Sequence, residues 1–157
     1  MTLMDLLKKA VFLAGAASFV ICSLFLNGMG GLAILTVSDE KYSAIGVMLL
    51  CSVLMFAVSF VMLFFKKTPT DLVSLLFNAA GTVLYALPVN ALTSISGDAV
   101  PKENIEILTN RIYPSVIVSV LFALYALLSL FSEERRLKRQ AKRDEKNREL
   151  RSDERIV

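Results

Sequence analysis

The sequence predicts an all-α fold, a bundle of four transmembrane helices followed by a charged, partly helical tail. Of the 157 residues, 55% are hydrophobic and the mean hydropathy is +0.63, which is high for a water-soluble fold of this size. Seventeen of the 31 acidic and basic residues follow Ser132, and most of the others flank long apolar runs. Each run exceeds the roughly 20 residues that a helix needs to cross a bilayer. In a soluble protein, charged residues would alternate with apolar residues at helical or strand spacing.

The apolar runs define the expected domain organisation. A membrane domain at residues 1–132 contains spans at about 10–34, 43–65, 70–93 and 112–132, and the tail covers 133–157. Lys8 and Lys9 precede the first run as in a signal peptide, but the run is longer than the roughly 7–15 apolar residues of such a peptide. We therefore expect a retained helix. The segment 27–31, Asn-Gly-Met-Gly-Gly, predicts that this helix loosens, kinks or ends there.

Two connections carry local signals. Thr68 fits a helix N-cap, Pro69 fits the first helical position, and Asp71 suits the positive end of a helix dipole. The third span should therefore begin there. In the longest loop, at residues 93–111, Ile105 and Leu108 could face one side of a short interfacial helix.

Lysine and arginine positions predict the orientation of the spans. Fourteen basic residues lie on one side of the membrane: Lys8, Lys9, Lys66, Lys67 and ten in the tail. Lys41, Lys102 and Arg111 are the three on the other side. Short flanks rich in Lys and Arg remain in the cytoplasm. Both termini are therefore expected to be cytoplasmic, and the short loops and compact length favour a bacterial inner membrane.

The composition excludes several kinds of chemistry. Between their flanking residues, the four runs contain no acidic or basic side chain, and the chain has no histidine. Intramembrane carboxylates mark proton-coupled transport and aspartyl proteolysis, and histidine is the commonest metal ligand. Cys22 and Cys51 are far apart and fit small buried residues better than a redox pair. We therefore predict no enzymatic activity, no cofactor and no metal, although carboxylates of the 93–111 loop leave an interfacial site open.

A stripe of polar side chains marks the third span. Asn78, Thr82 and Asn90 recur with Ala86 at every fourth position, and Tyr85 lies beside them. Pro88 leaves the carbonyl of Leu84 without its helical partner and predicts a kink. The stripe either lines a polar pocket or permeation path, or forms hydrogen bonds between helices, which contribute about 0.6 kcal/mol each in membranes.

Two stripes of small side chains predict close helix contacts. Ala10, Ala14, Ser18 and Cys22 form one in the first span, and Ser115, Ser119 and Ala123 form the other in the fourth. Either stripe could pack the bundle internally or receive a partner protein.

The tail begins with a cluster of basic residues below the fourth span. The cluster consists of Arg135, Arg136, Lys138, Arg139, Lys142 and Arg143. It either binds anionic lipid headgroups, at roughly 1 kcal/mol per basic residue, or only fixes the orientation. The tail has no aromatic residue that could stack on bases, so nucleic-acid binding is not expected.

These features lead to two hypotheses of function. The first is a non-enzymatic accessory subunit or scaffold that packs against other membrane proteins or against copies of itself. The second is an oligomeric pore, holin-like protein or passive path for an uncharged solute, lined by the polar stripe.

Overall fold

The computed structural model describes residues 3–37, 40–65, 67–95, 101–132 and 137–146. Four helical segments are long and apolar enough to cross a membrane: Leu3–Leu35, Glu40–Phe64, Pro69–Ser94 and Lys102–Leu130. No β-strand occurs in these described parts of the chain. The prediction of an all-α bundle with four spans is confirmed, and the protein has the architecture of a multi-pass membrane protein.

The first span changes its winding without breaking. It consists of α1 (Leu3–Ser18), a π-helix η1 (Phe19–Asn27) and α2 (Gly28–Leu35). The helix was expected to loosen, kink or end near residues 27–31. The π-helix ends at Asn27, the first residue of that segment, and residues 28–31 begin the regular α2. Most of the irregular winding therefore lies in the apolar residues just before the glycines.

Gly31 has a packing role that explains why α2 tolerates it. A Cβ atom added to Gly31 would lie 3.2 Å from the carbonyl oxygen of Gly46, and one added to Gly46 would lie 2.8 Å from the carbonyl oxygen of Gly31. The two backbones are therefore in direct contact. Such an approach requires small residues on both helices and adds dispersion contacts between them.

The second and third spans form a helical hairpin of α3 (Glu40–Phe64) and α4 (Thr68–Ser94). Thr68 is already helical and Lys67 occupies the N-cap position, so the predicted cap was one residue too late. The Thr70 hydroxyl accepts a hydrogen bond from the backbone N–H of Lys67 at 3.2 Å and donates to its carbonyl at 2.7 Å. Pro88 lies within α4, which continues past it to Ser94.

The last span is preceded by a separate amphipathic helix. α5 (Lys102–Ile112) and α6 (Ser115–Leu130) meet at a turn formed by Tyr113 and Pro114. Ile105 is buried and Leu108 packs against the neighbouring core. The short helix with one apolar side, expected within the 93–111 loop, is therefore present.

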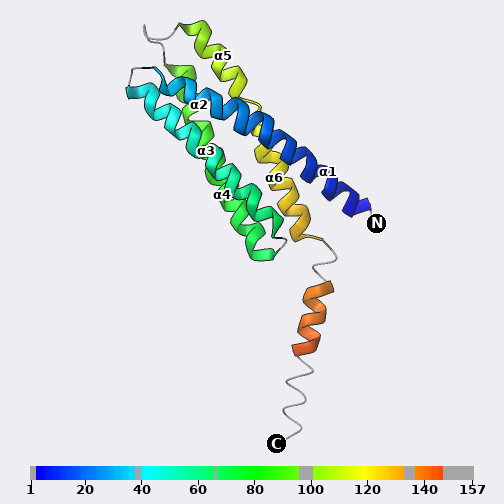
Figure 1. Ribbon diagram of the computed structural model, residues 1–157. Helices are drawn as coiled ribbons and strands as arrows, with labels where there is room; N and C mark the ends of the chain where they lie inside the picture. The colour runs from blue at the N-terminus through cyan, green and yellow to red at the C-terminus, as the bar shows by residue number, and fades with distance from the viewer. Residues whose placement is uncertain (1–2, 38–39, 66, 96–100, 133–136, 147–157) are drawn as a thin grey trace, which may run out of the picture.

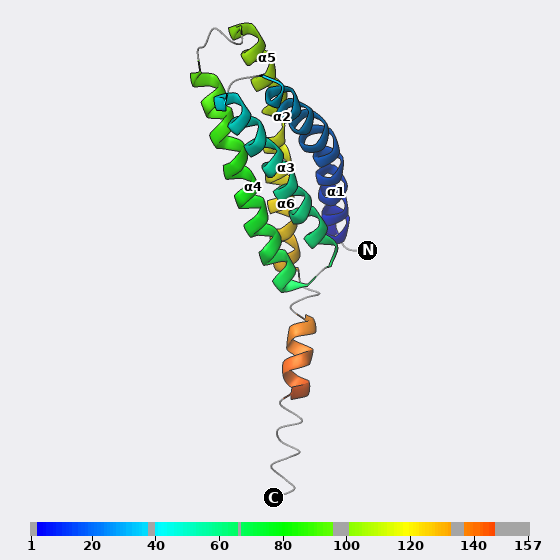
Figure 2. The ribbon, with the colours of Figure 1, turned by 60° about the vertical axis from the view of Figure 1, so that its left-hand side comes forward.

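The first span crosses the bundle diagonally, because α1 lies against α6 while α2 lies against α3 (Figure 1). α4 packs against both α3 and α6, which closes the bundle. The N-terminus, the α3–α4 turn and the end of α6 lie at one end, here called the proximal end (Figure 2). The α2–α3 connection and α5 lie at the other, the distal end.

Each half of the bundle has its own core. The distal core joins α2, α3, α4 and α5 around the buried Leu49, Tyr85 and Ile112. The proximal core joins η1, α3 and α6 around Phe56 and Phe122. Aromatic rings extend the proximal core, and those of Phe60 and Phe122 stack with centroids 5.5 Å apart.

Candidate functional site

The polar stripe of α4 begins at its contact with α6. The Asn78 side-chain amide donates to the carbonyl of Ser119 at 3.0 Å, and the hydroxyls of Thr82 and Ser119 lie 2.7 Å apart. Thr82 also bonds the carbonyl of Asn78 at 2.7 Å. The polar stripe of the third span and the small-residue stripe of the fourth therefore meet at Ser119.

The other residues of the predicted stripe do not take part in the contact with Ser119. The buried Tyr85 hydroxyl donates to the carbonyl of Ile112 at 2.7 Å, just before the turn between α5 and α6. Pro88, three residues further along α4, is also fully buried. Asn90 is exposed on the outside of the bundle. Asn78, Thr82 and Tyr85 thus bond to neighbouring helices, and Asn90 lies apart from them.

The small-residue stripe of the first span is divided between two environments. Ala10 and Ala14 are exposed on α1, whereas Ser18 and Cys22 are partly buried. The Cys22 carbonyl accepts a hydrogen bond of 2.9 Å from the buried Ser115 hydroxyl of α6. The two small-residue stripes therefore meet at their distal ends.

One further residue of each helix lies near the contact between α1 and α6: Ala123 of the fourth-span stripe, and Gly15, which the first-span stripe did not include. Ala123 is partly buried on α6. A Cβ atom added to Gly15 would lie 3.3 Å from the ring of Phe122. Close packing of α1 on α6 therefore uses Gly15, one position away from the predicted stripe.

Three polar contacts were missed by sequence reasoning. Ser59 and Ser74 each donate to the other's backbone carbonyl at 2.9 Å, across α3 and α4. The Asn27 amide of η1 donates to the Ser52 hydroxyl at 3.4 Å. Single serines in apolar runs carry no distinguishing signal, because a serine hydroxyl can also bond to its own helix.

Two further polar residues are buried in unexpected places. Ser23, in η1, is fully buried. Asp71 is also fully buried, in the first turn of α4, where the positive end of the helix dipole favours a carboxylate. The sequence did not predict this burial, because Asp71 lies at the edge of an apolar run, where a charged residue is usually exposed.

The basic cluster is described only in part. Residues 137–146 form an exposed helix beyond the proximal end, which includes Lys138, Arg139, Lys142 and Arg143 (Figure 2). Arg135 and Arg136 lie outside the described residues. The N-terminus of α1 is at the same end of the bundle, so the Lys8 and Lys9 segment and the tail share one side.

Cys22 and Cys51 are free thiols. Within the described ranges, no group of three or more His, Cys, Asp or Glu residues could hold a metal ion.

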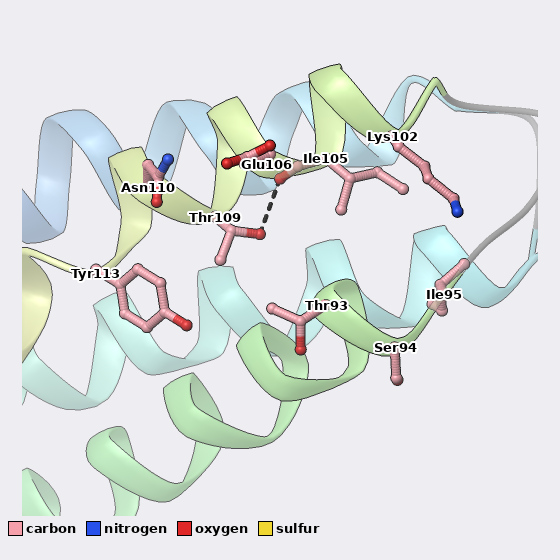
Figure 3. A pocket seen from close by; sticks show the side chains of 9 residues that line it. All are labelled: Thr93, Ser94, Ile95, Lys102, Ile105, Glu106, Thr109, Asn110 and Tyr113. Carbon is pink, nitrogen blue, oxygen red and sulfur yellow. Dashed lines mark hydrogen bonds between the residues drawn. The ribbon is translucent and has the colours of Figure 1, made fainter.

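A pocket of about 450 Å³ lies at the distal end, between the last turn of α4 and α5 (Figure 3). Six of its lining residues recur on α5 and its C-cap at intervals of three or four, which places them on one helix face. The lining consists of Thr93, Ser94, Ile95, Lys102, Ile105, Glu106, Thr109, Asn110 and Tyr113. This periodicity is visible in the sequence, but α4 supplies the opposite wall, which the sequence alone does not place.

No protein-family model matches the chain, and no curated protein and no solved structure is detectably similar to it.

Proposed function

We propose that the protein is a non-enzymatic accessory subunit or scaffold, which acts by packing against other membrane proteins or against a second copy of itself. The observation that carries this proposal is how the polar groups within the spans are used. Asn78, Thr82 and Tyr85, three of the four residues that would line a path, form hydrogen bonds that connect α4 to α6 and to the carbonyl of Ile112. The fourth, Asn90, is exposed on the outside of the bundle. The chemistry of the first three thus holds the bundle together.

The surface of α1 offers a site for such packing. Ala10 and Ala14 are exposed one turn apart, and Leu13 beside them is 67% exposed. Small residues at this spacing let a second helix backbone approach closely, which is the main source of helix association in lipid. α1 lies in the proximal half of the bundle, at the end where the helix of residues 137–146 also lies (Figure 1). A partner with an acidic segment next to its own span could therefore contact both.

We place both termini in the cytoplasm of a cell whose inner membrane holds the protein. In the sequence, fourteen basic residues flank the spans on the side of the termini and three flank them on the other side. In this orientation, the basic tail faces the leaflet surface that carries anionic lipids. Lipid contact by the tail and protein contact by α1 would then act on the same side.

Extraction in a mild detergent followed by native gels and mass spectrometry tests the proposal. We expect co-purifying membrane proteins or a defined homo-oligomer, and Ala10→Leu or Ala14→Leu should weaken the association. Ala86→Leu is the matched control, because Ala86 is also exposed but lies on α4. A strictly monomeric species without co-purifying protein contradicts the proposal.

A further inference from the structure

Residues on both walls of the distal pocket carry oxygen atoms that can accept hydrogen bonds. Three of its hydroxyls donate to carbonyls of their own helices: Thr93 to Asn90 at 2.7 Å, Ser94 to Ala91 at 2.9 Å and Thr109 to Ile105 at 2.8 Å. A hydroxyl that has used its single proton keeps its lone pairs as acceptors. The Glu106 carboxylate adds two more acceptor oxygens on α5 (Figure 3). This part of the pocket suits a donor with several N–H groups.

The pocket also contains a positive group at a fixed separation from Glu106. Lys102 lies one helical turn earlier on the same face of α5, or about 6 Å along the axis. Its ammonium points towards Ile95, at the opposite end of the pocket from Tyr113 (Figure 3). Among the described residues, neither Lys102 nor Glu106 forms an ion pair, so both charges are available to a ligand.

The remaining lining residues give the pocket apolar walls. Ile105 is buried on the α5 wall, and Ile95 and Tyr113 lie at the two ends (Figure 3). Tyr113 is 48% exposed, at the level where the amphipathic α5 meets the membrane-spanning α6. Tyrosine favours the interface between lipid and water, which fits a pocket at headgroup depth.

We propose that this pocket binds a zwitterion, in which a primary ammonium is joined by a short link to a phosphate or carboxylate. Glu106 and the acceptor hydroxyls bind the ammonium, and Lys102 binds the anionic group. This chemistry occurs in the headgroup of phosphatidylethanolamine and in free solutes such as phosphoethanolamine. The inference depends on neither the partner proteins nor the orientation proposed above.

Binding of short-chain lipids to the purified full-length protein tests the assignment. Titrations by native mass spectrometry compare phosphatidylethanolamine with phosphatidylcholine, whose quaternary ammonium has no N–H to donate. We expect phosphatidylethanolamine to bind about tenfold more tightly, the difference that one charge-assisted hydrogen bond supplies. Equal affinity for the two lipids overturns the proposal.

Charge variants on the two faces of α5 provide matched controls. Glu106→Gln should abolish the preference for phosphatidylethanolamine, whereas Glu103→Gln should keep it, because Glu103 is exposed but does not line the pocket. Lys102→Gln should weaken both lipids about tenfold, and Arg111→Gln should weaken neither. Unchanged helix content and elution show that each variant is folded. Equal effects of Glu106→Gln and Glu103→Gln contradict the assignment.

Competition separates the two sources of the zwitterion. If free phosphoethanolamine displaces the lipid, the site recognises the headgroup chemistry alone and a soluble ligand is supported. If only the intact lipid binds, the acyl chains contribute and the ligand is a membrane lipid. Both outcomes support zwitterion binding, and preference for a headgroup without an ammonium, such as phosphatidic acid, contradicts it.

Discussion

Single residues decide how closely the helices of this bundle pack. In lipid, apolar side chains gain little by leaving the solvent, so shape and hydrogen bonds carry the association. Gly31 and Gly46 bring the backbones of α2 and α3 into contact, and Ser59 and Ser74 exchange hydrogen bonds between α3 and α4. Glycine and serine are common in membrane helices. These four matter for packing because each contacts a small or polar residue of the neighbouring helix.

Replacement of Gly46 by alanine should destabilise the bundle by about 1–3 kcal/mol, the usual cost of an overpacked contact. The new methyl group would lie 2.8 Å from the carbonyl oxygen of Gly31, which is backbone and cannot swing away. Gly28→Ala is the control, since its Cβ would meet only the carbonyl oxygen of Ser23 at 3.9 Å. Unfolding in mixed micelles measures both, and equal destabilisation would contradict the close-contact argument.

A double-mutant cycle of Ser59→Ala and Ser74→Ala should give a coupling energy of about 0.6–1.7 kcal/mol, the range of interhelical hydrogen bonds in membranes. The coupling arises because each hydroxyl bonds to the other residue. Pairing Ser59→Ala with Ser94→Ala should give no coupling, because Ser94 bonds only to its own helix at the far end of α4. Additive effects of Ser59 and Ser74 would argue against reciprocal bonding.

At the scale of elements, the first span differs from the other three in winding. A π-helix bonds each N–H to the carbonyl five residues earlier, so it holds more residues per turn than an α-helix. These extra residues in each turn rotate α2 about the helix axis relative to α1. As a result, α1 packs on α6 and α2 packs on α3. The Gly30 and Gly31 pair then faces the core. Segments of this kind occur frequently at functional sites.

Deletion of Ile21 should therefore be tolerated better than deletion of Leu54. Ile21 is 60% exposed within the π-helix. The π-helix has more residues per turn than an α-helix, so it can lose one residue by rewinding towards an α-helix. Leu54 is similarly exposed, at 63%, but α3 is α-helical throughout. Removing it would turn one half of α3 by about 100° relative to the other. Elution of the detergent-solubilised variants as a single folded species measures the difference, and equal tolerance would refute the role given to η1.

Elements also show how far the sequence predicts the structure. Apolar length predicted all four spans, and Ile105 with Leu108 predicted α5. Pairing was not predictable, because serine and asparagine stripes do not reveal which helix lies opposite: Ser119 meets Asn78 and Thr82 across 41 and 37 residues of chain. The π-helix was also missed, since its residues resemble any other apolar run. The pocket could not be predicted either, because its two walls are formed only when α5 packs against α4.

At the scale of the whole molecule, the bundle has one basic end and one end with mixed charge. The N-terminus and the tail helix share the proximal end, while the pocket between α4 and α5 occupies the distal end. Contacts with partners and with anionic lipids, as proposed above, would use the proximal half. The zwitterion site would use the opposite surface. The two proposals therefore use opposite ends of the bundle, and each can be tested without the other.

Cysteine labelling measures that orientation. In a variant whose Cys22 and Cys51 are replaced by alanine, Glu103→Cys should react with a membrane-impermeant maleimide in intact cells. Lys138→Cys should react only after the cells are permeabilised. Both positions are exposed, so accessibility depends on the side of the membrane alone. The reverse labelling pattern would contradict the orientation predicted from the basic residues.

The contact between Asn78 and Ser119 has a consequence for biosynthesis. Ser59 and Ser74 satisfy each other as soon as the α3–α4 hairpin has entered the membrane. Asn78 needs Ser119, which is made 41 residues later, or about 2–8 seconds at common rates of translation. During that interval the Asn78 side-chain amide lacks its acceptor, the Ser119 carbonyl, and its exposure to the lipid core would be unfavourable. We therefore expect the nascent third helix to wait beside the translocon, or an insertion chaperone, until the last helix emerges.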